Sequence, residues 1–193
     1  MTGDGNNRAP AGKPDKGEVF MPEAMKKLAE SRHEGQFRRA RRGETRVPYI
    51  RHPETVAQTL LAWGEPEDSP AVAMAWGHDL LEDTATTFDE LVAASNETVA
   101  EGILLLTREK RGVRRCYLDR IARSGNREAL LVKMADRIGN ARDFIHLAGP
   151  LRAFGYLHEA DCILAAVENL PQDAVLRRAA AAWRELDTLL RRA

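Results

Sequence analysis

The chain has 193 residues, a length that fits one domain with a sizeable buried core. Hydrophobic residues make up 44% of it and charged residues 30%, a composition that excludes a wholly disordered or membrane-embedded chain. Lys plus Arg and Asp plus Glu both number 29, so the overall charge gives no indication of a nucleic-acid or membrane partner.

Residues 1–20 are rich in Gly, Pro, Asn and Asp, and we interpret them as a disordered N-terminal tail. From residue 21 onward apolar residues recur with helical spacing, and alternating Val/Ile/Thr runs are missing. The pattern predicts an all-α fold, a single bundle of about eight to ten helices over residues 21–193.

Prolines and capping residues indicate where the helices begin. Four prolines suit a first helical position, where the missing N–H costs nothing: Pro22, Pro53, Pro70 and Pro171. Thr87 precedes Glu90 by three residues, the spacing of a capping box. The predicted helices cover residues 22–33, 53–62, 70–83, 88–94, 97–107, 113–123, 127–147, 151–168 and 172–192.

Positive charge is concentrated in two segments. Residues 38–51 hold six arginines against the single acid Glu44, and residues 108–127 hold eight Lys or Arg against two acids. This favours a localised anionic ligand, although a solvated helix face explains many single charge runs. The first segment overlaps a predicted irregular loop over residues 37–48.

The last predicted helix is amphipathic, so it either closes the core or serves as the face of a homo-oligomer. Cys116 and Cys162 are far apart and have neither metal-binding nor redox spacing. No signal core and no membrane-spanning run is present, and we expect a cytoplasmic protein.

The stretch GHDLLEDTATT, residues 77–87, places one histidine and three carboxylates within six residues. On a helix, with about 100° per residue, these four polar side chains fall within about 140° of arc. They are His78, Asp79, Glu82 and Asp83. Leu80 and Leu81 point the other way, toward a core, so the polar face needs a positive partner such as a metal ion.

Two further segments supply matching side chains. Lys133, Asp136 and Asn140 share one face of a predicted helix, and His52 lies just before Pro53 at a helix start. The candidate metal ligands are therefore two imidazoles and two carboxylates: His52, His78, Asp79 and Asp136. This donor set suits Mn²⁺, Fe²⁺ or Zn²⁺ better than Mg²⁺ or Ca²⁺.

The same residues occur in a familiar order. The motifs are HEGQ (33–36), PYIRHP (48–53), HDLLEDTATT (78–87), LT (106–107), VKMADRIGN (132–140) and RAFGY (152–156). Over residues 24–165 the chain resembles the His-Asp (HD) metal-dependent phosphohydrolases. Within them it is similar to the stand-alone hydrolase domain of the RelA/SpoT family, the small alarmone hydrolases that include the metazoan SpoT homologue.

The resemblance implies a role for each matching residue. One Mn²⁺ ion would be bound by His52, His78, Asp79 and Asp136. Glu82 and Asp83 would activate the attacking water or protonate the leaving oxygen. The substrate-binding positions would be Arg38, Arg39, Lys110, Asn140, Arg152 and Tyr156. For two of these an ordinary role stays open, since Tyr156 also suits the core and Arg152 a helix surface.

The resemblance also implies a reaction, removal of the 3′-pyrophosphate from the alarmone (p)ppGpp to give GDP or GTP and pyrophosphate. Alternative substrates for the same pocket are pApp-type adenosine alarmones, NADPH and 5′-nucleotides. A second class of alternative is a catalytically silent nucleotide-binding module. Against it, none of the six metal-ligand and acid/base positions has been lost.

Two features depart from the family pattern. Gly77 replaces a bulky apolar residue before His78, which predicts a looser helix and extra space behind the metal. The arginine-rich loop between Gln36 and Pro48 is longer than is usual in the family. The arginines that face the substrate, and the base preference, therefore stay open.

Overall fold

The computed structural model describes residues 22–109 and 113–193. These residues form helices and turns, and their extended structure is limited to one isolated bridge between Phe37 and Pro48, which confirms the all-α prediction. The predicted tail and Lys110 lie outside the described residues. The helices are α1 (Pro22–Arg32), α2 (Arg51–Trp63), α3 (Pro70–Gly77), α4 (Leu80–Asp83), α5 (Phe88–Ala94), α6 (Glu97–Leu106), α7 (Arg114–Ser124), α8 (Arg127–Ala148), α9 (Pro150–His158), α10 (Asp161–Asn169) and α11 (Ala174–Arg192).

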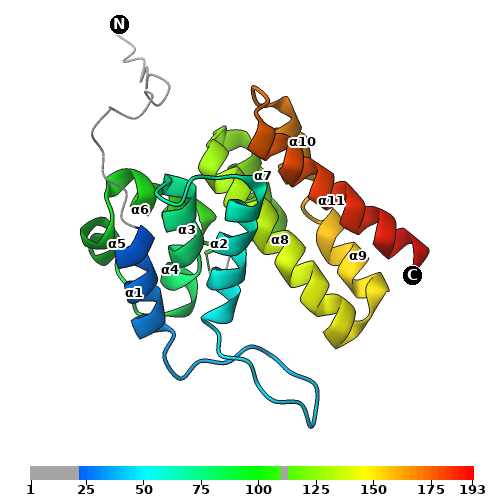
Figure 1. Ribbon diagram of the computed structural model, residues 1–193, viewed down its shortest axis with the longest axis horizontal. Coiled ribbons are helices and arrows are strands. Elements are labelled where there is room, and N and C mark those ends of the chain that lie inside the picture. The colour runs from blue at the N-terminus through cyan, green and yellow to red at the C-terminus, as the bar shows by residue number, and fades with distance from the viewer. Residues whose placement is uncertain (1–21, 110–112) are drawn as a thin grey trace, which may run out of the picture.

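Two helices form the centre of the bundle. Every residue of α3 from Ala71 to Gly77 is buried, because α1, α2, α6 and α8 pack around it. The long helix α8 is buried continuously from Ala129 to Ile138 and runs between the α2–α3 side and the α9–α11 side (Figure 1). A helix that is buried all round normally carries apolar residues only. The polar residues in the buried part of α8 therefore call for a functional explanation.

Capping explains several helix boundaries. Ser69 accepts a hydrogen bond from the Val72 N–H at the start of α3. The predicted capping box at Thr87 and Glu90 is present with both reciprocal hydrogen bonds. At the end of α2, Gly64 adopts the left-handed conformation, with φ of 96°, that a side chain would disfavour.

Two predicted helices are each divided in the structure. The helix predicted over 70–83 is α3 and α4 with a turn at His78 and Asp79, because Nδ1 of His78 donates to the Ala75 carbonyl oxygen at 2.7 Å. In an uninterrupted helix that carbonyl would accept from the Asp79 N–H. The helix predicted over 151–168 is α9 and α10, since Ala160 leaves helical geometry and redirects α10 onto α7.

The space expected behind Gly77 is not there. A Cβ atom built on Gly77 would lie 2.6 Å from Cδ1 of Ile103 and 2.9 Å from Sδ of Met25. That prediction was wrong, because side chains of the neighbouring helices α1 and α6 fill the space beside Gly77.

The C-terminal helix α11 closes the core through one apolar face, which includes Val175, Leu176, Trp183 and Leu186. Within the described residues no helix combines the length and apolar character needed to cross a membrane. The expected arginine-rich loop is confirmed over residues 38–47, which extend below α1 and α2 in Figure 1. The loop is fastened to α8, where Arg38 donates to Asp143 at 2.7 Å and Glu44 contacts His146 at 2.9 Å.

Candidate active site

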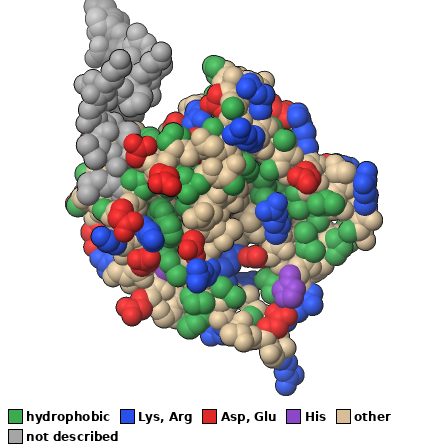
Figure 2. All heavy atoms as spheres, in the orientation of Figure 1, with side chains coloured by type: hydrophobic (Ala, Val, Ile, Leu, Met, Phe, Trp, Pro, Cys, Tyr) green, Lys and Arg blue, Asp and Glu red, His purple; other side chains and the backbone are tan. Residues whose placement is uncertain are grey.

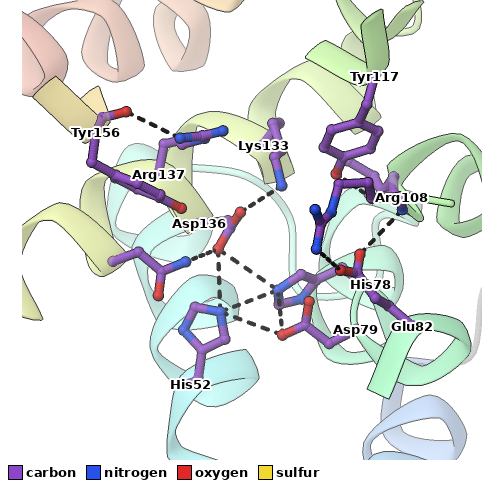
Figure 3. A network of polar contacts seen from close by, with 12 residues as sticks. His52, His78, Asp79, Glu82, Arg108, Tyr117, Lys133, Asp136, Arg137 and Tyr156 are labelled. Atoms are coloured by element: carbon purple, nitrogen blue, oxygen red, sulfur yellow. Dashed lines mark hydrogen bonds and ion pairs between the residues drawn. The ribbon is translucent and has the colours of Figure 1, made fainter. Parts of the chain in front are cut away.

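The four predicted metal ligands come together from three parts of the fold. His52 lies in the first turn of α2, His78 and Asp79 form the turn between α3 and α4, and Asp136 lies on α8 (Figure 3). The Nε2 atoms of the two histidines are 3.3 Å apart. Both imidazoles are almost completely buried, with 5% of His52 and 3% of His78 exposed.

The donor atoms of these residues face a common point. One ligand atom from each of His52, His78 and Asp79 lies within 4.8 Å of the others, so this cluster could bind a metal ion. Oδ1 of Asp136 lies 3.2 Å from Nε2 of His52 and 4.0 Å from Nε2 of His78. Two imidazoles and two carboxylates in one buried cluster fit a transition-metal ion.

Neighbouring groups orient the ligands. The hydrogen bond from Nδ1 of His78 to Ala75 leaves Nε2 directed at the cluster, the arrangement in which an outer hydrogen bond fixes a ligand's orientation. On α8, Lys133 donates to Oδ2 of Asp136 at 2.7 Å, and Asn140 donates to its Oδ1. The buried polar residues of α8 thus hold Asp136 in place.

Neighbouring charges shift the pKa values of the cluster residues. Burial disfavours the imidazolium form of His78, but the carboxylates of Asp79 and Asp136 outweigh it and raise the pKa of His78 to about 9. Burial also opposes ionisation of Asp79, yet the adjacent histidines hold the pKa of that carboxyl well below its usual range. Burial likewise opposes ionisation of Asp136, and the Lys133 ammonium overrides it and lowers the Asp136 pKa.

The two predicted acid/base carboxylates lie at the same cavity and are held differently. Glu82 accepts hydrogen bonds from the backbone N–H of Arg108 at 3.1 Å and from its guanidinium at 3.2 Å. Oδ2 of Asp83 lies 2.7 Å from the Tyr49 hydroxyl. Leu80 is fully buried on the opposite side, as the sequence predicts.

Three members of the cluster, His52, Asp79 and Asp136, line a cavity of about 210 Å³. It adjoins a second cavity of about 480 Å³, because Arg38, Tyr49, Arg108, Asn140 and Tyr156 line both. In the space-filling view this face of the molecule is hollowed above the arginine-rich loop, and side chains of both charges surround the hollow (Figure 2). The site is therefore a small cavity lined by charged side chains, with a larger cavity beside it.

The structure places the predicted substrate-binding residues unequally. Arg38, Asn140 and Tyr156 line both cavities, whereas Arg39 lines only the larger one. Arg152 is exposed on α9 and is not among the residues that line either cavity. With Lys110 outside the described residues, the substrate role of all these side chains stays a prediction.

Several residues at the site were not singled out as functional from the sequence. They are Tyr49, Arg108, Tyr117, Lys133 and Arg137, all of which line the smaller cavity. For three of them the sequence contained an indication of a role at the site. Tyr49 stands three residues before His52, Lys133 shares a helix face with Asp136, and Arg108 is the first residue of the second basic segment. Their importance depends on contacts between residues far apart in the chain, which local spacing does not reveal.

The all-helical fold is shared with solved structures. A solved structure described as a metazoan ortholog of SpoT that hydrolyzes ppGpp matches with a TM-score of 0.69 over 94% of this chain and 97% of that one, at 21% identity. The structure of lmo0812 from Listeria monocytogenes EGD-e matches with a TM-score of 0.55 over 74% and 99%, at 20% identity. No protein-family profile matches the chain.

Sequence comparison points to particular relatives. The chain is 38% identical over 100 residues to the guanosine-3′,5′-bis(diphosphate) 3′-pyrophosphohydrolase MESH1 of Danio rerio, which covers 50% of this chain and 56% of that protein. It is 35% identical over 124 residues to the Haemophilus influenzae enzyme of the same activity name, covering 60% and 17%. The matches thus span little more than half of the fish protein and a small part of the bacterial one. The chain is related in sequence to proteins named for ppGpp hydrolysis.

Proposed function

We propose that the protein is a Mn²⁺-dependent hydrolase that removes the 3′-pyrophosphate of (p)ppGpp, releasing pyrophosphate and leaving GDP or GTP. The observation that carries the proposal is the buried cluster of His52, His78 and Asp79, with Asp136 beside it, in the wall of a cavity that also holds Glu82 and Asp83. Relatives named for this activity support the same reading.

The metal would be held by the two imidazoles and two carboxylates of the cluster. A bound divalent ion supplies a water of lowered pKa and polarises a phosphoryl oxygen. Mn²⁺ is the ion we propose, and Fe²⁺ and Zn²⁺ are compatible with the same donors. The Ala75 carbonyl and Lys133 would keep His78 and Asp136 in ligand orientation.

The proton transfers are assigned to the two carboxylates that we do not assign as metal ligands. Glu82 and Asp83 are not needed as ligands, and both line the cavity. Glu82 accepts two hydrogen bonds from Arg108, which hold its carboxylate at the cavity in a position to accept a proton from the attacking water. A positioned general acid or base of this kind contributes about 10² to 10⁴ in rate.

Cationic side chains at the cavity would bind the pyrophosphate. Arg108, Lys133 and Arg137 line its wall. Arg137 is 2% exposed, and its buried Nε has no hydrogen-bond partner among the described residues. A buried N–H without a partner costs free energy, and a phosphate oxygen would satisfy it.

The larger cavity would take the nucleoside. Its volume of about 480 Å³ falls in the range of small-molecule sites, and aromatic rings of Phe37, Phe144 and Tyr156 line it beside Arg38 and Arg39. The residues that we propose contact the substrate are Arg38, Arg39, Lys110, Asn140, Arg152 and Tyr156. We further propose that residues 21–193 act as one HD domain in the cytoplasm.

The proposal is tested with purified protein, ppGpp and Mn²⁺, by measuring pyrophosphate release. Asp79→Ala and Glu82→Ala should each lose at least about 100-fold of the rate. Asp68→Ala and Glu101→Ala, which change exposed acids on other parts of the surface, serve as matched controls and should keep wild-type rates. Release by all five proteins at equal rates would contradict the assigned site.

An inactive wild-type protein would redirect the search for the substrate. Measured Mn²⁺ binding without pyrophosphate release would reject ppGpp as the substrate, and pApp, NADPH and 5′-nucleotides would be tried next. Neither binding nor release would reject the metal cluster.

A further inference from the structure

Tyr49 is fixed more firmly than an ordinary loop residue. Its N–H donates to the Gln36 carbonyl oxygen at 2.9 Å, and its own carbonyl accepts from the His52 N–H at 2.8 Å. Its ring stacks on the imidazole of His33, with the ring centroids 4.6 Å apart and the planes 26° apart. The phenol is therefore held in one orientation from both its backbone and its ring.

This orientation places the Tyr49 hydroxyl between two carboxylates. The oxygen lies 2.7 Å from Oδ2 of Asp79 and 2.7 Å from Oδ2 of Asp83. The same Oδ2 atom of Asp79 lies 3.2 Å from Nε2 of His78 and 3.5 Å from Nε2 of His52, so it is the oxygen that faces the cluster. Tyr49 thus connects a metal ligand to a carboxylate that is not a ligand.

We propose that Tyr49 is a positioning residue, whose hydroxyl holds the Asp83 carboxylate at a fixed place beside the metal ligand Asp79. A hydroxyl has one proton and can donate to one carboxylate at a time. The bond therefore alternates between Asp79 and Asp83, and the phenol orients both the metal ligand and the carboxylate beside it.

The HEGQ motif supports the same arrangement from the other side. Nε2 of Gln36 donates to the backbone carbonyl of Asp83 at 3.2 Å, and Oε1 of Gln36 lies 2.9 Å from Nδ1 of His33. Gln36 therefore holds the main chain of Asp83 while Tyr49 holds its side chain. Within the HEGQ motif, Gln36 therefore has a structural role at the site.

The test is Tyr49→Phe, which keeps the ring on His33 and removes only the hydroxyl. The inference rests on the proposed hydrolase function. In the Mn²⁺-dependent release of pyrophosphate from ppGpp, kcat should fall about 10-fold to 100-fold, while KM stays within about twofold. The Mn²⁺ affinity, measured by the electron paramagnetic resonance of the free ion, should weaken about 10-fold.

Tyr156→Phe is the matched comparison, since it removes a hydroxyl from the same cavity on the side assigned to the nucleoside. Its effect should appear in KM. A loss confined to KM in Tyr49→Phe would overturn the inference, because the hydroxyl would then contact the substrate. An unchanged kcat would also overturn it, because the hydroxyl would then have no effect on the rate of the reaction.

The outcome separates this inference from the proposed function. A wild-type protein that releases no pyrophosphate refutes the proposed function. The inference about Tyr49 is then tested by the Mn²⁺ affinity alone. In that case equal affinity of wild type and Tyr49→Phe would overturn the inference, and a weaker affinity would support it.

Discussion

The Nε2 atoms of His52 and His78 lie 3.3 Å apart, with carboxylate oxygens of Asp79 and Asp136 beside them. In the sequence the two histidines are separated by most of α2, a loop and the whole of α3, and the fold brings them together at the buried start of α2 and the buried end of α3. The imidazolium of His78 pairs with these carboxylates, and this makes metal binding depend on pH.

Mn²⁺ affinity should rise with pH between about 6.5 and 9. The pKa of His78 in the metal-free protein is about 9, so its ring carries a proton at neutral pH that a metal must displace. The affinity should increase about tenfold per pH unit and level off above the pKa. Calorimetric titrations in buffers of different ionisation enthalpy should show release of about one proton at pH 7.5, and an affinity independent of pH would contradict the account.

Lys133→Met should destabilise the metal-free protein by about 3–5 kcal/mol, because it leaves the buried Asp136 carboxylate without its ammonium partner at 2.7 Å. Urea unfolding with and without Mn²⁺ measures this, and Mn²⁺ should recover part of the loss because the cation pairs with Asp136. The control is Lys27→Met on exposed α1. A loss below about 1 kcal/mol for Lys133→Met would mean that water already solvates Asp136.

Gly77→Ala should lower the free energy of unfolding by about 1–3 kcal/mol, since the new Cβ would crowd Ile103 and Met25 in a close-packed core. Gly155→Ala is the matched control, because it lies in α9 with no atom within 4 Å of the added carbon. That change should be neutral or stabilising by up to about 1 kcal/mol. Equal effects of the two substitutions in chemical denaturation would show that packing around α3 adapts.

His158 should make stability depend on pH. Its Nδ1 lies 2.8 Å from Asp161 and its Nε2 2.8 Å from Asp187, so the imidazolium satisfies both carboxylates. Burial opposes the charge, but these two acids override it and raise the pKa of His158 above its usual value. A raised pKa gives a stabilisation that is complete below about pH 6.5 and disappears as the pH rises through the folded-state value.

The comparison is between wild type and His158→Gln, unfolded in urea at pH 5.5, 7 and 8.5. The wild type should be more stable by about 1 kcal/mol at the lowest pH, and the difference should shrink as the pH rises. A difference that stays constant over this range would show that His158 stabilises the α9–α11 contact through packing.

The sequence was sufficient for the helical class and for most helix boundaries, because prolines and caps such as Ser69–Pro70 and Thr87–Glu90 act locally. It was insufficient at the turn between α3 and α4. His78 and Asp79 keep right-handed dihedral angles there, and the interruption arises from a side-chain bond to Ala75 that no residue pattern announces.

At the site, too, residues could be predicted where a local pattern marks them and could not be predicted where only contacts distant in the sequence define them. The four candidate ligands could be chosen from the sequence since each stands at a helix start or on a polar face. Tyr49 and Arg108 could not, because their partners Asp83 and Glu82 lie 34 and 26 residues away. Residue spacing indicates which side chains share an element, whereas tertiary packing decides which elements meet.

The most direct test of the central claim follows ppGpp by ³¹P NMR in the presence of the protein and Mn²⁺. The account predicts that pyrophosphate and GDP appear in equal amounts as ppGpp disappears, and that chelating the metal stops the reaction. Release of orthophosphate, or a ppGpp spectrum unchanged by protein with bound Mn²⁺, would contradict it.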